Sequence, residues 1–189
     1  MVKKRTLTRE KVIDQAIQMI AERGVDQLTI RALADELAVR PQSIYNYIES
    51  LNDLLDQVGV RFVGDLADRL MHNLMGVSGK EALMIFAREF RQGCLTQRHL
   101  APLLMNPNDL RPLVQTHAAL VQLYQQMFHS LHLSEADGTT LVEASLYRSA
   151  LFGFIVQEIG GFMRVTPQKV NERFDQTMRL AISQFSSLA

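Results

Sequence analysis

The 189-residue sequence predicts an all-helical protein, in which three short N-terminal helices precede a larger set of longer helices. Two observations support this fold class. Apolar residues recur at the i, i+3, i+4, i+7 spacing of amphipathic helices along nearly the whole chain, and no run alternates with the period of two that strands require. Glycine, proline and asparagine residues divide this pattern into separate helices.

The first helix is expected over residues 9–23. Thr8 is placed to cap it, Leu7 and Val12 have the spacing of a hydrophobic staple, and Gly24 follows as a C-terminal stop. Its inner face is expected to consist of Val12, Ala16, Met19 and Ile20.

Residues 28–48 predict two short helices folded back on one another. Thr29 can cap the first of them, and the pattern breaks at Ala38-Val39 before it restarts. Ile44 and Ile48 are expected to face inward. The side chains expected to face outward are Pro41, Gln42, Ser43, Tyr45 and Asn46. A short helix with polar and aromatic residues on its free face is typical of segments that enter the major groove of DNA.

These residues resemble a known family. The segment from about Thr8 to Leu55 is similar to the DNA-binding domain of TetR-type transcriptional repressors. The similar stretches are Thr8-Arg-Glu-Lys-Val-Ile-Asp-Gln-Ala, Gly24-Val25, Leu28-Thr-Ile-Arg-Ala-Leu-Ala, Leu37-Ala-Val and Ile44-Tyr-Asn-Tyr-Ile. Two positions depart from the family pattern: Ala38 stands where glycine is usual, and Leu51 stands where a lysine often contacts phosphate. The resemblance implies a helix-turn-helix domain joined to a C-terminal ligand-binding and dimerisation domain.

Side-chain chemistry and the matching family positions indicate roles in DNA binding. Arg31 and Gln42 are expected at base edges, because arginine pairs with guanine and glutamine with adenine. Asn46 suits either a base or a phosphate. Phosphate contacts are expected from Thr29, Arg40, Ser43, Tyr45 and Tyr47, and from a basic N-terminal arm that contains Lys3, Lys4 and Arg5.

We expect a DNA-binding domain over residues 1–51 and a helical ligand-binding and dimerisation domain over residues 52–189. A long helix from about Asn52 to Met75 joins them with no intervening linker. Further helices are expected over residues 80–91, 97–105, 110–131, 135–159 and 167–188, with breaks at Gly93, Pro102, 106–108, Ser134 and Gly160-Gly161.

The last two helices predict a dimer interface. Residues 147–159 are apolar on more than one face, and the final helix has a single apolar stripe, so one chain of this size is not expected to cover both. The resemblance implies a four-helix bundle with a second copy and a pseudo-palindromic operator. The predicted interface residues are Phe152, Ile155, Val156, Ile159, Phe174, Met178, Ile182 and Phe185. The alternative is an ordinary core face.

The resemblance also implies a small apolar or amphipathic ligand. The middle helices carry flexible and aromatic side chains suited to an adaptable pocket, although core packing explains them equally well. The expected contacts are Met71, His72, Met75, Phe86, Phe90, Met105, His117, Phe128 and Arg148. Residues 147–161 also resemble, through Gly153 alone, a C-terminal class named for a tryptophan-histidine-glycine motif. No metal or other cofactor is predicted.

Composition limits the other classes of function. Lys and Arg together number 20, as do Asp and Glu, so the net charge does not favour nucleic acid. Cys94 is the single cysteine, which excludes an intramolecular disulfide and fits a reducing compartment. No apolar run reaches the roughly 20 residues of a membrane span. No phosphate-binding glycine loop or activated nucleophile indicates an enzyme.

These patterns favour a homodimeric, cytoplasmic transcriptional regulator, most simply a repressor that a ligand releases from double-stranded operator DNA. Activation is not distinguished from repression. The alternative is a helical ligand-binding or adaptor dimer with little specific DNA binding, which the neutral net charge and Leu51 favour.

Overall fold

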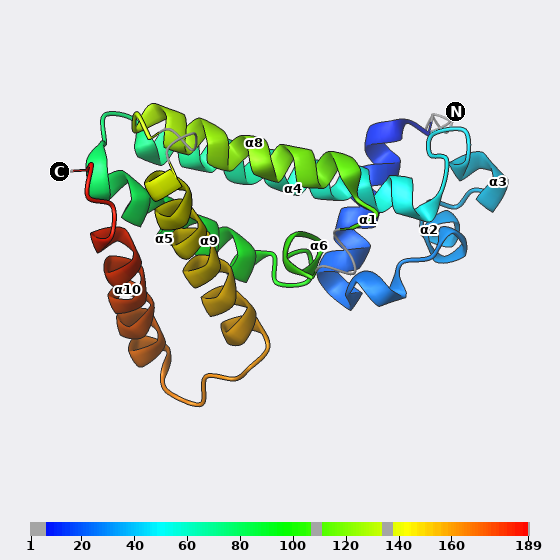
Figure 1. The fold of residues 1–189 in the computed structure, drawn as a ribbon. Coiled ribbons are helices and arrows are strands. Elements are labelled where there is room, and N and C mark those ends of the chain that lie inside the picture. The colour runs from blue at the N-terminus through cyan, green and yellow to red at the C-terminus, as the bar shows by residue number, and fades with distance from the viewer. Residues whose placement is uncertain (1–6, 107–110, 134–137, 189) are drawn as a thin grey trace. The chain divides into compact units, whose positions relative to one another are not determined.

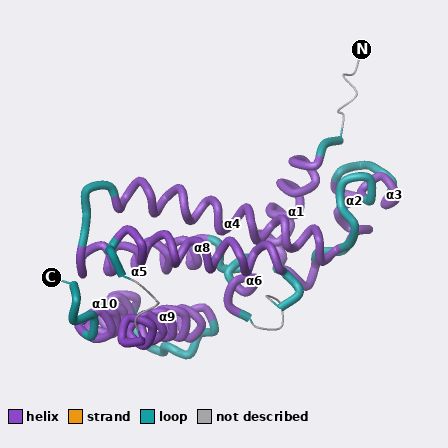
Figure 2. Tube along the Cα trace, turned by 45° about the horizontal axis from the view of Figure 1, so that its top comes forward, coloured by secondary structure: helices purple, strands orange, loops and turns teal. Residues whose placement is uncertain are grey.

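A computed structural model describes residues 7–106, 111–133 and 138–188 (Figure 1). These residues form helices joined by turns, with no strand among them, so the predicted fold class is confirmed (Figure 2). The chain divides into two compact units, one made of Met1–Val63 with Gln97–Ala119 and the other of Gly64–Thr96 with Leu120–Ala189. Helices α4 (Leu51–Leu74) and α8 (Val114–Ser130) each supply residues to both units.

Helix α1 (Arg9–Arg23) begins and ends where its capping residues predict. The Thr8 hydroxyl accepts a hydrogen bond from the Lys11 amide at 3.3 Å, and the Gly24 amide donates to the Ile20 carbonyl at 2.8 Å. Gly24 has a φ of 87° and a ψ of 163°, a conformation almost restricted to glycine. The predicted inner face of Val12, Ala16, Met19 and Ile20 is buried, so α1 covers the core of the first unit.

Helices α2 (Ile30–Glu36) and α3 (Pro41–Ile44) follow α1. The Thr29 hydroxyl accepts from the Ala32 amide at 3.1 Å, which confirms the predicted cap of α2. Helix α3 ends at Ile44 and residues 45–47 form turns, so the helical part is short. Ile44 and Ile48 are 0% and 3% exposed, as their spacing predicts.

The corner between α2 and α3 is a Schellman motif. The Val39 amide donates to the Ala34 carbonyl at 2.9 Å, and the Ala38 amide donates to the Asp35 carbonyl at 3.1 Å. This motif places its C′ residue in the left-handed region, and Ala38 has a φ of 53°. An alanine therefore occupies a position at which glycine costs less conformational energy.

Residues 97–119 complete the first unit from a distant part of the sequence. Helix α6 (Pro102–Met105) buries Leu103 and Leu104, and turns precede it where a helix over residues 97–105 is expected. The ring nitrogen Nδ1 of His99 lies 2.8 Å from the Ala21 carbonyl oxygen, near the end of α1.

In the second unit, helices α5 (Gly79–Thr96), α9 (Gly138–Ile159) and α10 (Pro167–Ser183) pack on one another (Figure 1). Arg91 on α5 donates from Nε and Nη2 to the two carboxylate oxygens of Glu158 at 2.7 and 2.6 Å. Its Nη2 also donates to Asn171 Oδ1 at 2.8 Å. One partly buried guanidinium thus joins all three helices. Thr166 caps α10, ahead of Pro167 in the first turn, as predicted.

Gly93 does not end α5, so the predicted break there is wrong. The helix continues to Thr96, and a Cβ atom on Gly93 would lie 2.1 Å from Cδ2 of Leu66 on α4. The glycine therefore serves close packing between helices and not termination, a distinction that only the tertiary structure reveals.

None of the helices in the described residues combines the length and apolarity needed to cross a bilayer. The described residues also contain no group of three or more His, Cys, Asp and Glu side chains that could hold a metal ion.

We predict that Ala38→Gly stabilises the protein. The left-handed conformation costs an L-residue about 1–2 kcal/mol, whereas the added unfolded-state freedom of glycine costs about 0.4–1 kcal/mol, so the net gain is expected to be about 0.5–1 kcal/mol. Denaturant unfolding followed by circular dichroism measures this change.

Gly24→Ala is the matched control, because no atom lies within 4 Å of the added Cβ and only the backbone conformation matters. It is expected to destabilise the protein by about 1–3 kcal/mol. Equal effects of the two substitutions would contradict the backbone explanation.

Candidate functional site

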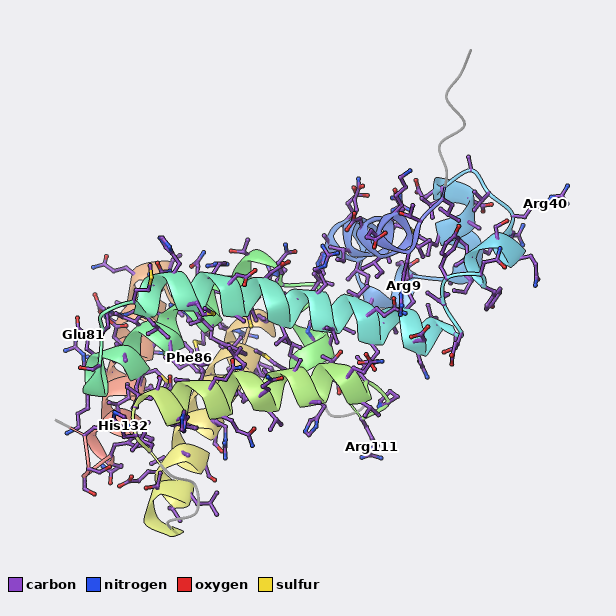
Figure 3. The ribbon with its side chains drawn as sticks, turned by 90° about the horizontal axis from the view of Figure 1, so that it is seen from above. Arg9, Arg40, Glu81, Phe86, Arg111 and His132 are labelled. Atoms are coloured by element: carbon purple, nitrogen blue, oxygen red, sulfur yellow. The ribbon has the colours of Figure 1, made fainter. Side chains whose placement is uncertain are left out.

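A polar surface surrounds α3. Arg40, Gln42, Tyr45 and Asn46 are exposed, and Ser43 is half-buried. Figure 3 shows Arg40 extending away from the helices that carry it. The Ile44 side chain is buried and attaches this segment to the first unit. The polar residues that were predicted to face outward are thus on the other side of the segment from Ile44.

The local sequence explains the start of this surface. Pro41 occupies the first turn of α3, where no backbone N–H is needed. The Ser43 amide donates to the Arg40 carbonyl at 2.8 Å, and the Tyr47 amide donates to the Ile44 carbonyl at 2.9 Å. These turn bonds hold the polar side chains on a rigid backbone.

The hydroxyl of Tyr47 is engaged within the chain. It donates a hydrogen bond to the Leu7 carbonyl at 2.8 Å, and the ring is half-buried. Tyr47 therefore positions the segment that leads into α1. The predicted basic-arm residues Lys3, Lys4 and Arg5 lie outside the described residues.

The N-terminal end of α2 also carries exposed polar side chains. Thr29 and Arg31 are exposed there, although the Thr29 hydroxyl already accepts the capping bond from Ala32. The Arg23 guanidinium of α1 donates to Glu36 of α2 at 2.6 Å, and this hydrogen bond raises the pKa of Arg23. Leu51, which replaces the family lysine, is the half-buried first residue of α4.

A chain of polar side chains links α1 to the start of α4. Arg9 Nε donates to Gln57 Oε1 at 2.7 Å, and Gln57 Nε2 donates to Asp53 Oδ1 at 2.8 Å. The other carboxylate oxygen of Asp53 accepts from the Glu49 amide at 2.8 Å, and the Asp53 amide donates to the Ser50 hydroxyl at 3.0 Å. These bonds fix the segment that follows the polar surface.

Asp56 on α4 binds the N-terminal end of α8, within the first unit. Its carboxylate accepts from the amides of Thr116 and Gln115 at 2.7 and 3.0 Å and from the Thr116 hydroxyl at 2.7 Å. Asp56 is 7% exposed, and a Cβ atom on Gly59 would lie 2.3 Å from the Thr116 hydroxyl oxygen. This Asp56 cap satisfies free amides of the α8 terminus in a close contact between two helices.

Known proteins share the segment that carries the polar surface. Residues 12–58, which contain α2, α3 and the start of α4, match the family model described as bacterial regulatory proteins, tetR family. This segment is therefore similar to the corresponding helices of TetR-family regulators.

Proteins similar to this chain match different shares of its length. An uncharacterised HTH-type transcriptional regulator of Mycobacterium tuberculosis is 29% identical over 162 residues, which cover 83% of this chain and 72% of the relative. The class D tetracycline repressor of Escherichia coli is 33% identical over 92 residues, or 49% of this chain and 42% of that protein. The solved structure of Bacillus subtilis FadR in complex with stearoyl-CoA has a TM-score of 0.70 at 14% identity, covers 94% of this chain and 100% of that one, and shows the same fold.

The second unit contains an apolar pocket of about 280 Å³. It brings together three of the predicted ligand contacts, Met71, Met75 and Phe86. Its lining comprises Ala67, Leu70, Met71, Leu74, Met75, Val77, Ala82, Phe86, Leu123, Gln126, Met127 and Ser130. Met71 and Met75 are each 72% exposed, so flexible thioether side chains border the pocket on the solvent side.

The other predicted ligand contacts lie elsewhere. The ring of Phe90 stacks on Phe86 at 6.0 Å, and Phe128 packs against Tyr147 with Arg148 over its face at 5.9 Å. These side chains belong to the aromatic core of the second unit. His72 is exposed outside the pocket lining, and Met105 and His117 belong to the first unit.

Most of the predicted interface residues are buried within a single chain. Ile155, Phe174, Met178, Ile182 and Phe185 are at most 4% exposed. Their apolar stripe is therefore the inner face of α9 and α10, which corrects the assignment of these five to an intersubunit surface. Of the remaining predicted residues, Val156 is 45% exposed, and Phe152 and Ile159 are half-buried.

Apolar residues are also exposed on α9, on α10 and in the segment between them. Val142, Leu146, Val156, Phe162 and Leu180 are 45–75% exposed. A shallow pocket of about 550 Å³ lies in this region, with Gly153 and Leu180 among its lining residues. Apart from Val156, these residues were not predicted, because they are scattered in the sequence and give a weaker pattern than the inner stripe.

Sequence reasoning also missed Tyr124, a residue of α8. Its side chain is buried, and its hydroxyl has no hydrogen-bond partner among the described residues. Tyr147, by contrast, donates to the Leu83 carbonyl at 2.7 Å. Burial raises the pKa of Tyr124, and the nearby Cys94 adds to this effect whereas Arg148 opposes it. The phenol therefore remains protonated and able to donate at neutral pH.

We predict that Asp56→Ala destabilises the protein by about 2–4 kcal/mol, because the partly buried amide of Gln115 and the buried amide and hydroxyl of Thr116 lose a charged acceptor. Urea unfolding measures the change. Asp65→Ala is the control, since Asp65 is an exposed carboxylate on the same helix, and it is expected to stay within about 0.5 kcal/mol of the native protein. A loss below about 1 kcal/mol for Asp56→Ala, in the range of a neutral hydrogen bond, would contradict the importance of the Asp56 cap.

Proposed function

We propose that this TetR-family regulator is a homodimeric repressor, which binds a pseudo-palindromic operator in double-stranded DNA and is released by a small apolar or amphipathic ligand. The observation that carries the proposal is the exposed set Arg40, Gln42, Tyr45 and Asn46 on a rigid corner whose other side is buried. Because bacterial DNA lies in the cytoplasm, we propose that the protein acts there.

Each exposed side chain has a proposed role in this complex. Arg31 and Gln42 contact base edges, and Asn46 contacts a base or a phosphate. Arg40, Ser43 and Tyr45 contact phosphates, and Thr29 contributes at the helix terminus. Tyr47 acts through its bond to Leu7, which holds the residue ahead of α1. The basic residues Lys3, Lys4 and Arg5 contact phosphates.

A dimer on the outward faces of α9 and α10 is supported by the apolar residues exposed there and by Gly153. A glycine inside a helix costs about 0.5–1 kcal/mol relative to alanine. Among the described residues, no atom beyond the neighbouring helix backbone lies within 4 Å of a Cβ placed on Gly153, so their packing does not require the glycine. Close approach of a second copy at this point supplies a reason for it.

The pocket supports ligand control because of the helices that line it. Residues of α4 and of α8 form much of its wall, and both helices also supply residues to the first unit, where the Asp56 cap joins them. A ligand that shifts α4 against α8 changes the position of the DNA-binding surface. A coupling of about 1–3 kcal/mol changes operator affinity by about 5- to 150-fold.

Selection of duplexes from a random pool by the purified protein tests this function. A two-fold symmetric enriched sequence, bound with an affinity that falls steeply as salt increases, is the expected result, because several phosphates are neutralised. The alternative, a ligand-binding or adaptor dimer, predicts that no sequence is enriched at any salt concentration. That outcome would reject the proposed operator binding.

Substitutions in the polar surface are expected to separate base contacts from phosphate contacts. Gln42→Ala should cost about 1–3 kcal/mol on the selected operator and relax its specificity at one base position. Arg40→Ala should weaken binding to all sequences alike and lower the salt dependence by about one unit of slope. Fluorescence anisotropy across a salt series distinguishes the two patterns, and identical behaviour of the two variants would contradict the assigned roles.

A matched pair of glycine variants tests the dimer. Gly153→Arg and Gly64→Arg both place a long cation at a helix glycine with open space around its Cβ. Each should raise monomer stability by up to about 1 kcal/mol through helix propensity. Only Gly153→Arg is expected to shift the protein from dimer to monomer, as measured by sedimentation equilibrium. Dimers that persist in Gly153→Arg would place the interface elsewhere.

A further inference from the structure

The unpaired hydroxyl of Tyr124 lies inside an aromatic cluster. The Tyr124 ring is 5.1 Å from Phe86, 5.9 Å from Phe90 and 5.9 Å from Phe152, measured between ring centroids. A buried hydroxyl without an acceptor is destabilising, and proteins rarely retain one without a reason. Tyr147 in the same cluster shows the usual solution, because its hydroxyl bonds to a backbone carbonyl.

Phe86 connects this cluster to the apolar pocket. Its ring is in contact with the Tyr124 ring and is also part of the pocket lining, whereas Tyr124 itself is not. Phe86 therefore stands between the space open to a ligand and the unpaired phenol.

We propose that the ligand of this pocket is a neutral, mainly apolar molecule with one hydrogen-bond acceptor, which displaces Phe86 and accepts the hydrogen bond of the Tyr124 hydroxyl. This inference rests on the ligand control proposed above and specifies the chemistry of the ligand. The apolar part occupies the pocket, and the single acceptor oxygen reaches the aromatic cluster.

The size of the pocket limits the ligand. A cavity of about 150 Å³ holds one benzene molecule, so the 280 Å³ pocket accommodates a body of about two fused rings. The two exposed methionines at its border allow some adjustment of shape.

The lining determines the charge of the ligand. No ionisable side chain is among the pocket residues. Their polar side chains are Gln126, which is exposed, and Ser130, whose hydroxyl already donates to the Met127 carbonyl at 2.6 Å. An ammonium or carboxylate group would lose its hydration there without a partner of opposite charge.

Tetralone and tetralin provide a matched pair of probes, since they differ by one carbonyl oxygen. Isothermal titration calorimetry of each with the native protein and with Tyr124→Phe, in the absence of DNA, forms a double-mutant cycle. Tyr124→Phe is expected to weaken tetralone binding by about tenfold and to leave tetralin binding within about twofold. Naphthoate and naphthylmethylamine are expected to bind more weakly than tetralone.

Tyr147→Phe is the control variant, because it removes a hydroxyl that is already paired. It is expected to lower the melting temperature and to leave the ratio of tetralone to tetralin affinity unchanged. Tyr124→Phe, which removes an unpaired hydroxyl, is expected to keep or raise the melting temperature, so a loss of ligand affinity in this variant does not reflect unfolding.

Phe86→Leu tests the displacement step. With the ring removed, tetralone is expected to bind at least as tightly as to the native protein, and a second substitution of Tyr124 is expected to cost the same factor of about ten. An unchanged tetralone affinity in Tyr124→Phe, no binding of either probe, or tighter binding of naphthoate than of tetralone would overturn the proposal. Operator selection by the same protein remains a separate result, so failure here is distinguishable from failure of DNA binding.

Discussion

The Asp56 carboxylate accepts hydrogen bonds from the first turn of α8, and the placement of the helices in the first unit depends on this interaction. A carboxylate taken out of water is costly unless its oxygens are bonded, and the two amides and one hydroxyl of the α8 terminus supply that compensation. The positive end of the helix dipole adds to the same interaction. Helix α6 and the start of α8 are thereby held in the unit that carries the polar surface around α3, although they are distant from it in the sequence.

A second set of polar bonds depends on this arrangement. Gln57 follows Asp56 on α4, and it connects Arg9 of α1 to Asp53 at the start of the same helix. The orientation of α4 that the Asp56 cap sets is also the orientation in which Gln57 reaches both partners. Rigid placement of the polar surface around α3 therefore combines buried apolar contacts, through Ile44 and Ile48, with a continuous line of hydrogen bonds.

The sequence predicts those features whose causes are local. The caps at Thr8, Thr29 and Thr166 and the inner face of α1 follow from residues within one or two helical turns, and the structure confirms them. The family pattern predicts the DNA-binding surface. The role of Gly93 could not be predicted in this way. The sequence does not distinguish a glycine that ends a helix from one that leaves room for a side chain such as Leu66. The stripe that includes Phe174 and Ile182 is likewise ambiguous, since an apolar face does not state whether its own chain or a partner covers it. The role of Asp56 depends on a contact across 60 residues, which periodicity does not report.

The division of the chain has a consequence for engineering hybrid sensors. The polar surface around α3 does not belong to a separate N-terminal module. The unit that carries it includes a second stretch of chain that begins after Thr96, and the unit boundaries fall inside α4 and α8. A chimera with a single junction after residue 51 would separate Asp56 and Gln57 from α1, α2 and α3. A hybrid that exchanges the whole first unit between relatives needs three junctions, after Val63, Thr96 and Ala119. The other design replaces only the solvent-facing side chains of α3.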